Sequence, residues 1–180
     1  EKLISNYKIL SKINPKISIA PVLKSNAYGH GIVEVGGVVD GLDTPFICVD
    51  SLYEALQLRK AGIKSEILIM GYIDPESLKN KKYNFSYALW DLTLASVLNK
   101  YQKGASIHIF MDTGMNREGI KIKCRVMNYE SRIKGNCCLK HFLKELEKLN
   151  NLKVDGLMSH LAAADDPKNP LNELQLNNFK

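Results

Sequence analysis

The sequence predicts an α/β fold built on a parallel β-sheet. Short apolar segments of strand length alternate with longer segments whose apolar residues recur every three or four positions, and this difference in period separates buried strands from amphipathic helices. The predicted strands start about 20 to 30 residues apart, which leaves room for a helix between them. An open doubly wound sheet and an eight-stranded barrel both fit this alternation, and the periodicity does not choose between them.

The first part of the chain is predicted to run helix, strand, turn, helix and strand. Apolar residues at helical spacing precede Asn14-Pro15, a pair that ends a helix. Residues 16–23 are rich in β-branched and apolar side chains and predict a strand. A turn-prone segment with two glycines follows at 25–31, then a helical patch, then a short apolar strand at 46–49.

Capping residues set the next boundaries. Ser51 and Glu54 have the spacing of a capping box, and Gly62 lies where that helix should end. Residues 66–70 read as a strand. Asp74-Pro75 is then expected to open a short helix, because proline is tolerated at its first position.

The later elements follow the same alternation. Asp91 is expected to cap a helix that ends at Gly104, and the segment 139–149 has a clear amphipathic helical pattern. Further strands are expected at 85–90, 106–111 and 154–158.

Composition excludes several classes of function. The net charge is +6, but the lysines are scattered and their densest cluster lacks interleaved aromatic residues, so a solvated surface fits better than a nucleic-acid site. No apolar run reaches the roughly 18 to 20 residues that a membrane span needs, and no secretory signal is recognisable.

The four cysteines predict neither disulfides nor a metal site. They are Cys48, Cys124, Cys137 and Cys138, without the Cys-x-x-Cys spacing of a zinc site. Cys48 stands in an apolar run and is expected to be a buried small hydrophobe. A reducing cytoplasm is therefore the expected location.

Polar residues follow three of the predicted strands. Lys24 ends the first, the segment 112–117 follows another, and His160 comes after the last. The carboxyl ends of parallel strands share one edge of the sheet, which is where α/β proteins bind ligands. The glycines here fit neither a Rossmann fingerprint nor a P-loop.

Lys24 is the most informative of these residues. A lysine partly removed from water at a strand end favours the free amine, which can form a Schiff base with an aldehyde or act as a base. Each residue also has a structural reading: Lys24 as a strand-end side chain that reaches water, His160 as a hydrogen-bonded structural histidine and Arg117 as a surface cation. Their shared edge favours the functional reading without deciding it.

Three segments resemble the motifs of alanine racemases, in the right order. The segment 22–31, VLKSNAYGHG, resembles the cofactor-lysine signature of that family, with Ser25 in place of alanine. The segment 112–119 resembles its Asp-Thr-Gly-Met-x-Arg-x-Gly element. The segment 155–165 resembles its Gly-x-x-Thr-His-x-Ala-x-Ala-Asp element, with Ser159 in place of threonine.

The resemblance implies an eight-stranded (β/α)8 barrel of the TIM type, followed by a mainly β domain. A full barrel takes roughly 250 residues, so residues 1–180 are expected to form one partial barrel domain with about six βα units. The remaining strands, the carboxyl-terminal β domain and a short leading segment are expected to be absent.

The resemblance also implies residue roles and a cofactor, pyridoxal 5'-phosphate. Lys24 would form the Schiff base with the cofactor and act as the base on the D-substrate. Tyr28 would hydrogen-bond the cofactor phosphate, Arg117 would lie near its phenolic oxygen and orient the substrate carboxylate, and His160 would pack against its ring. No metal is implied.

Two departures from the family pattern stand out. Phe110 occupies the place where many members carry a carbamylated lysine that positions the arginine, so Arg117 is expected to need another partner. The segment 121–138 is longer than the usual connection, which predicts a variable loop or an insertion rather than a functional lid.

The function expected from the resemblance is interconversion of L- and D-alanine, which supplies D-alanine for peptidoglycan, by a cytoplasmic homodimer. The second base would be a tyrosine from the partner's β domain, so this chain alone is expected to be inactive. A non-catalytic pyridoxal-phosphate-binding barrel, a serine or broad-specificity racemase and an inactive truncated product stay open. The run at 28–31 favours a racemase over the non-catalytic relatives.

Overall fold

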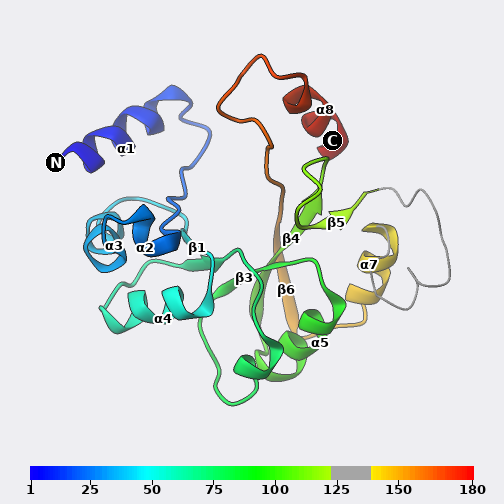
Figure 1. Ribbon diagram of the computed structural model, residues 1–180. Coiled ribbons are helices and arrows are strands. Elements are labelled where there is room, and N and C mark those ends of the chain that lie inside the picture. The colour runs from blue at the N-terminus through cyan, green and yellow to red at the C-terminus, as the bar shows by residue number, and fades with distance from the viewer. Residues whose placement is uncertain (123–138) are drawn as a thin grey trace. The chain divides into compact units, whose positions relative to one another are not determined.

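A computed structural model describes residues 1–122 and 139–180, so most of the expected insertion at 121–138 and three of the four cysteines lie outside the described residues. The chain divides into two compact units, Glu1–Ile73 and Asp74–Lys180. Each unit is an α/β structure whose paired strands are parallel, as the sequence predicts (Figure 1).

The first unit has a small parallel sheet covered by helices. Ile47 to Val49 pair in register with Ile67 to Ile69. The elements of this unit are α1 (Lys2–Ile13), α2 (Lys24–Tyr28), α3 (Ile32–Asp40), β1 (Ile47–Val49), α4 (Leu52–Lys60) and β2 (Ile67–Ile69).

The strand predicted at 16–23 is reduced to a single bridge, between Val22 and Cys48. Leu23 N donates to Cys48 O at 2.8 Å, and Cys48 N donates to Pro21 O at 2.8 Å. Residues 16–18 are exposed, and Pro21 has no N–H to give to a ladder. The pairing therefore starts only at Pro21, just before Lys24.

Cys48 has the character that its sequence context predicts. It is 5% exposed and makes no disulfide. Burial raises the pKa of the Cys48 thiol to about 11, because a thiolate is poorly solvated in an apolar environment. The thiol is therefore a protonated, unreactive part of the core.

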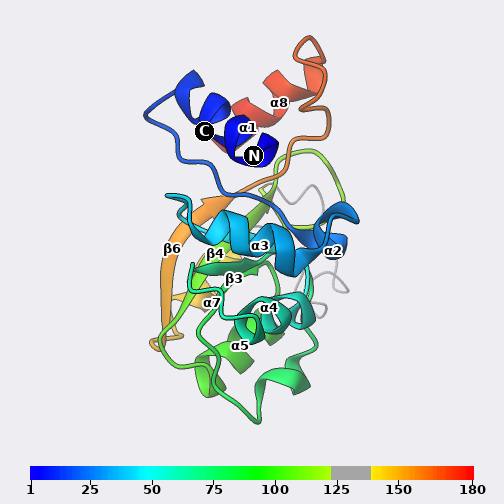
Figure 2. The same cartoon turned by 90° about the vertical axis from the view of Figure 1, so that its left-hand side faces the viewer.

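The helix boundaries of the first unit follow their capping residues. Ser51 Oγ accepts from Glu54 N at 3.2 Å and Glu54 Oε2 accepts from Ser51 N at 3.2 Å, so the predicted capping box is confirmed. Helices α3 and α4 lie side by side (Figure 2). The helices pack closely at Gly36, because a Cβ there would come within 2.6 Å of Leu58 Cδ2 and would displace that side chain.

The second unit is organised around one long strand, β4. It pairs with β3 and with β6, and its last residues, Met111 and Asp112, pair with β5. The elements of this unit are η1 (Pro75–Leu78), β3 (Ser86–Leu89), α5 (Leu92–Tyr101), β4 (Ala105–Asp112), β5 (Ile120–Lys121), α7 (Leu139–Leu146), β6 (Leu152–Met158) and α8 (Pro170–Phe179). The sequence did not predict β5 or α8.

One extra residue interrupts the pairing of β4 with β6. Ile107 pairs with Val154, whereas the next residue, His108, pairs with Gly156, so Asp155 is the extra residue of a β-bulge. Gly156 fits closely against its partner, because a Cβ there would come within 2.6 Å of His108 Nδ1.

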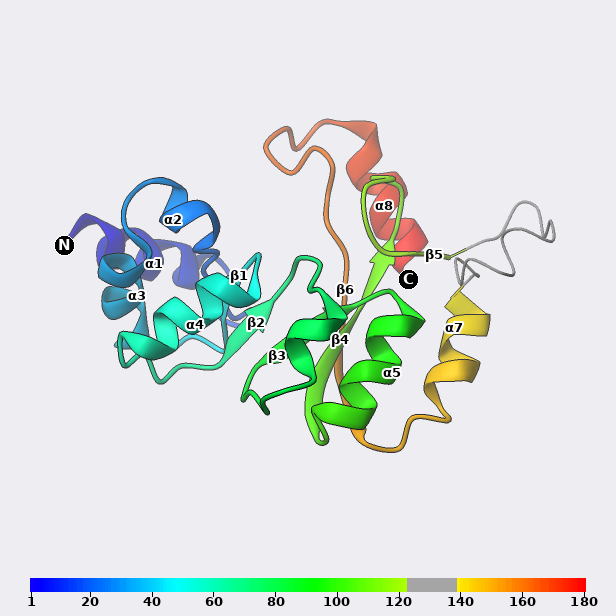
Figure 3. The same cartoon turned by 60° about the horizontal axis from the view of Figure 1, so that its bottom comes forward.

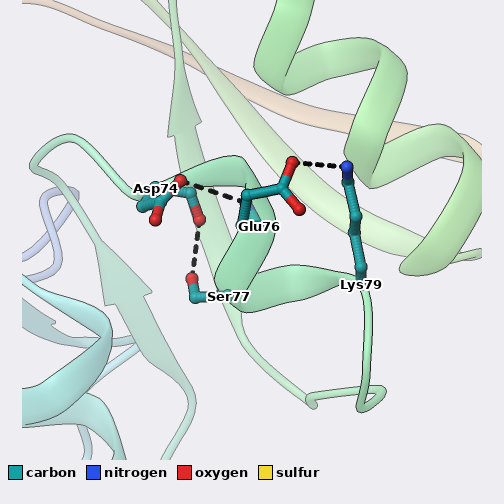
Figure 4. A network of polar contacts seen from close by, with 4 residues as sticks. All are labelled: Asp74, Glu76, Ser77 and Lys79. Carbon is teal, nitrogen blue, oxygen red and sulfur yellow. Dashed lines mark hydrogen bonds and ion pairs between the residues drawn. The ribbon is translucent and has the colours of Figure 1, made fainter.

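The short helix η1 opens as Asp74-Pro75 predicts. The Asp74 carboxylate accepts from Glu76 N at 3.1 Å, and Ser77 Oγ donates to Asp74 O at 2.6 Å (Figure 4). Lys79 pairs with Glu76 across one turn. Such a first turn satisfies N–H groups that have no partner within the helix.

Helices α5 and α7 lie side by side against the sheet of the second unit (Figure 3). The largest fully buried side chains of this unit include Leu78, Tyr87, Leu89, Leu98, Ile107, Ile109 and Phe142. Among the described residues, no helix is long and apolar enough to cross a membrane, and no group of three or more His, Cys, Asp or Glu side chains could hold a metal ion.

Candidate functional site

Lys24 opens a turn of unusual handedness. It is half-buried and directly follows Leu23, which is 4% exposed. The next four residues, Ser25 to Tyr28, have φ of 55°, 55°, 53° and 54°, so α2 is a left-handed turn. For residues other than glycine this conformation costs about 1–2 kcal/mol each. The surrounding structure must therefore hold the turn in place.

Glu54 holds the start of this turn from helix α4. Its Oε1 accepts from Ser25 N at 2.7 Å, and its Oε2 accepts from Asp50 N at 2.9 Å and from Ser51 N. Hydrogen bonds to a charged acceptor are stronger than those between neutral groups. One carboxylate thus both caps α4 and fixes the residue next to Lys24.

The far side of the turn closes on its own side chain. Asn26 Oδ1 accepts from Ile32 N at 2.8 Å, and Ala27 is 4% exposed. Tyr28, at the end of the turn, is 62% exposed and presents its phenol to solvent. The turn therefore has a fixed backbone and an accessible hydroxyl.

The loop from Asp112 to Gly119 is fixed at both ends. Asp112 Oδ1 accepts from Gly114 N at 3.0 Å and from Asn116 N at 2.9 Å. At the far end Gly119 has φ +103°, and a Cβ there would lie 2.6 Å from Asp112 N. Arg117 stands between these points, with its side chain 47% exposed and its Nε 3.7 Å from Glu118 Oε2.

Arg117 and His160 line the same hollow, as their predicted positions at one sheet edge require. The hollow is a shallow depression that is open to solvent. Phe110 forms part of its wall and packs edge-to-face on Trp90, with ring centroids 5.6 Å apart. The other lining residues are Met111, Asp112, Met115, Glu118 and Ser159.

The two loops that meet at the hollow are joined by hydroxyl groups. Thr113 Oγ1 and Ser159 Oγ are 2.7 Å apart, and Ser159 Oγ donates to Met111 O at 2.8 Å. Thr113 is 2% exposed. Ser159, which stands where the family has threonine, thus keeps a hydroxyl at a position where the structure uses one.

The four residues singled out from the sequence belong to two different units. Lys24 and Tyr28 share the left-handed turn of the first unit, and Arg117 and His160 share the hollow of the second. The sequence predicted Glu54 as a capping residue of α4 but not as the acceptor for Ser25 N, which lies 29 residues away in the sequence. Nothing in the local pattern around Glu54 indicates that contact.

Each of these side chains offers a different chemical group to a ligand. Arg117 offers a guanidinium for a carboxylate, phosphate or phenolate oxygen, His160 offers an aromatic face, and Lys24 offers an amine that can condense with an aldehyde. The hollow thus presents a guanidinium and an imidazole side by side at an open surface.

The alternation of helices with parallel strands, and polar side chains in the segments that follow those strands, are features of the α/β class. The family model "Alanine racemase, N-terminal domain" matches residues 1–180. The chain belongs to the family of alanine racemase N-terminal domains. The predicted α/β fold, part of an eight-stranded barrel, is confirmed by this match and by the solved structures of the family.

Individual relatives agree with the family match. The chain is 32% identical to an alanine racemase of Methanococcus maripaludis over 181 residues, covering 97% of this chain and 45% of that protein. It is 33% identical to an amino-acid racemase of Enterococcus faecalis over 162 residues, covering 89% of this chain and 21% of that protein.

A solved structure gives the same result. The alanine racemase of Clostridium difficile 630 in complex with cycloserine matches with a TM-score of 0.78 and 29% identity. The match covers 98% of this chain and 46% of that protein. The chain thus spans less than half the length of each of these three relatives.

Proposed function

We propose that the protein carrying this chain is a pyridoxal-phosphate-dependent amino-acid racemase that interconverts L- and D-alanine. The observation that carries the proposal is the Lys24 turn. Four consecutive non-glycine residues adopt a left-handed conformation. Such a conformation has an unfavourable free energy, and strained segments of this kind cluster at functional sites. The turn lies within the segment that resembles the cofactor-lysine signature of the family.

Each site residue has a task in this proposal. Lys24 would hold the cofactor through its amine and, once released, take or return a proton at the substrate Cα. Tyr28 would donate a hydrogen bond from its accessible hydroxyl to the cofactor phosphate. Arg117 would bind the substrate carboxylate, and His160 would pack on the cofactor ring. When bound, the cofactor supplies an electron sink that acidifies the Cα–H bond.

Inversion of the substrate needs a second base on the opposite face. We propose a tyrosine outside residues 1–180, contributed by the β domain of a second subunit in a homodimer. Residues 1–180 would then be one barrel domain of a cytoplasmic enzyme that supplies D-alanine for peptidoglycan. Residues 1–180 in isolation would racemise little or not at all, because the second base would be missing.

The substrate range has a second candidate. The relative from Enterococcus faecalis is named an amino-acid racemase, which favours testing a broad-specificity or serine racemase. A panel of L-amino acids, with the D-product measured by chiral chromatography, separates these candidates. The highest kcat/KM for alanine would support the proposal. The highest kcat/KM for serine, or equal values for several amino acids, would replace it with a serine or broad-specificity racemase.

The cofactor assignment is tested by covalent labelling. Pyridoxal phosphate followed by borohydride should mark a peptide containing Lys24 in the protein that carries this chain. Lys24→Ala should abolish the label and lower racemisation by about 10²–10⁴-fold or more. Lys16→Ala, at an exposed lysine of the same unit, is the matched control and should change neither. Labelling only at other lysines would remove Lys24 from the proposal.

A non-catalytic pyridoxal-phosphate-binding protein is the alternative from another class. It would give the same label at Lys24 with no D-alanine formed by the protein that carries this chain. The labelling and the racemisation assays together therefore decide between the two classes.

A further inference from the structure

Helix α8 faces its own unit with amides. Asn172, Gln175 and Asn178 are spaced three apart, which places them on one side of the helix. Gln175 is its only buried residue, at 1% exposure. The apolar side chains of α8 are instead substantially exposed: Leu171 is 41%, Leu174 51%, Leu176 53% and Phe179 40% exposed.

Gln175 satisfies its carboxamide through both loops of the hollow. Its Nε2 donates to Thr113 Oγ1 at 3.0 Å and to His160 O at 2.8 Å, and its Oε1 accepts from Ala162 N at 2.8 Å. Oxygen and nitrogen cannot be exchanged here, because a backbone N–H must donate and a carbonyl must accept. A buried amide is costly unless it is bonded in this way.

Each hydroxyl in this network has one hydrogen to donate, which fixes the direction of its hydrogen bonds. The single hydroxyl hydrogen of Ser159 goes to Met111 O, so Thr113 must be the donor in its contact with Ser159. Thr113 Oγ1 in turn receives the N–H of Gln175. The chain therefore runs from Gln175 through Thr113 and Ser159 to Met111.

The other two amides tie α8 to the same loops. Asn178 Nδ2 donates to Thr113 O at 2.7 Å, and Asn172 Nδ2 donates to Ala163 O at 2.9 Å. Figure 1 shows α8 beside the loop that follows β4. The helix is thus hydrogen-bonded to both loops that carry Arg117 and His160.

We propose that Gln175 is a positioning residue that fixes the Arg117 loop against the His160 loop, so that both side chains meet the same amino-acid substrate and cofactor. This inference rests on the proposed racemase function. The bonded atoms belong to Thr113, four residues before Arg117, and to His160 itself. Gln175 acts through these backbone and hydroxyl groups and touches no reacting atom.

Three variants of the complete protein test the inference. Gln175→Ala removes the carboxamide. Gln175→Glu keeps its size but replaces the donor with an acceptor, which would face the carbonyl of His160. Asn177→Ala is the matched control, because Asn177 is an exposed amide on the same helix.

The first measurement is backbone hydrogen exchange without cofactor. Gln175→Ala and Gln175→Glu should both speed exchange in residues 113–119 and 159–163 by about tenfold, since each leaves buried groups without partners. Exchange in α4 should not change, and Asn177→Ala should match the unsubstituted protein. The second measurement is steady-state kinetics, where the KM for the amino acid should rise more than kcat falls.

The comparison of Glu with Ala separates positioning from space filling. If Gln175→Glu exchanges and reacts like the unsubstituted protein, Gln175 only fills volume and the inference is wrong. It is also wrong if exchange is unchanged in both variants, or if exchange rises while KM stays the same. If the unsubstituted protein does not racemise any amino acid, the proposed function fails, while hydrogen exchange still decides whether Gln175 fixes the two loops.

A second variant covers the case in which Gln175→Ala does not fold. Thr113→Val interrupts the same chain at its middle and should speed exchange in the same two segments. Thr93→Val, at an exposed threonine of α5, is its control. Combined with Gln175→Glu, Thr113→Val should add less than its separate effect, because the two variants break one network.

Discussion

The Lys24 turn of the first unit and the Asp112–Gly119 loop of the second both leave the end of a parallel strand pairing with residues at positive φ. They are held from outside by different chemistry. The Lys24 turn is held by the carboxylate of Glu54, reaching from α4. The loop is held by amides of α8, chiefly Gln175 and Asn178.

The difference follows from what each segment offers to its neighbours. The turn and the α4 N-terminus present backbone N–H groups of Ser25, Asp50 and Ser51, and an acceptor with two oxygens satisfies all three. The two loops of the second unit present a hydroxyl, carbonyls and an N–H together. Only a group that both donates and accepts can serve such a mixture. A carboxylate therefore suits the turn, where only N–H donors need partners, and a carboxamide suits the two loops, where donors and acceptors both need partners.

The largest effect should come from adding a methyl group to the glycine that closes each segment. In Gly119→Ala the Cβ would lie 2.6 Å from Asp112 N and 2.8 Å from Met111 C, at φ +103°. Backbone strain and overlap together should lower the free energy of unfolding by about 3–5 kcal/mol. Gly29 has φ +89° with nothing within 4 Å of a Cβ, so Gly29→Ala should cost only about 1–2 kcal/mol.

Urea unfolding of both glycine variants measures this difference directly. Equal losses of stability would mean that the loop after β4 can shift to make room. In that case the loop would not be the more tightly closed of the two segments.

The next effect tests whether the anchor of the Lys24 turn must be a carboxylate. Glu54→Gln turns an NH2 group toward backbone N–H donors and breaks part of the three-way contact. The free energy of unfolding should fall by about 1–2 kcal/mol, and labelling of Lys24 by pyridoxal phosphate should slow. Glu34→Gln, at an exposed glutamate of the neighbouring helix α3, is the control. A variant with wild-type stability and labelling would show that the turn holds itself.

The smallest effect concerns a second carboxylate that binds backbone N–H groups in the first unit. Asp40 Oδ1 accepts from Ser65 Oγ and Ser65 N at 2.7 Å each and from Lys64 N at 2.9 Å. These bonds, led by the Ser65 hydroxyl, hold the pKa of Asp40 below its usual value. The stabilisation is complete above the pKa of the unfolded chain and is lost as pH falls through the lower folded value.

Asp40→Asn should therefore lower the free energy of unfolding by about 0.5–1 kcal/mol at neutral pH. The difference from the unsubstituted protein should shrink as pH falls below 4. The exposed Asp43 provides the control Asp43→Asn. Unfolding curves from pH 7 to pH 3 measure the effect, and a difference independent of pH would contradict its electrostatic origin.

Much of the fold could be predicted because its signals are local. The capping box at Ser51 and Glu54, the cap at Asp91 and the short apolar strands all depend on residues close together in sequence. The left-handed turn could be located but not its hand, since only Asn26 among its four residues is a type that readily takes this conformation. The two-residue strand β5 is too short to have a period.

Helix α8 escaped prediction for a different reason. Hydrophobic periodicity finds a helix by its buried apolar stripe. Helix α8 has no such stripe: the side that bonds to its unit carries amides, and Gln175 is its only buried residue. The candidate site was predictable to the extent that sequence places Arg117 and His160 after strands that share an edge. The residues that hold these two loops in place act across gaps of up to 65 residues, which no local pattern reveals.

The bulge at Asp155 determines which residue of the following loop reaches the end of β4. If regular pairing continued forward from Ile107 and Val154, Met111 would come opposite Met158. With the extra residue Phe110 pairs with Met158, so Ser159 is next in register for Met111, to whose carbonyl its hydroxyl donates. A hydroxyl therefore arrives where a thioether would have stood, one step before His160. One inserted residue in the middle of a strand thus shifts by one position every residue that follows it, including those of the loop after the strand.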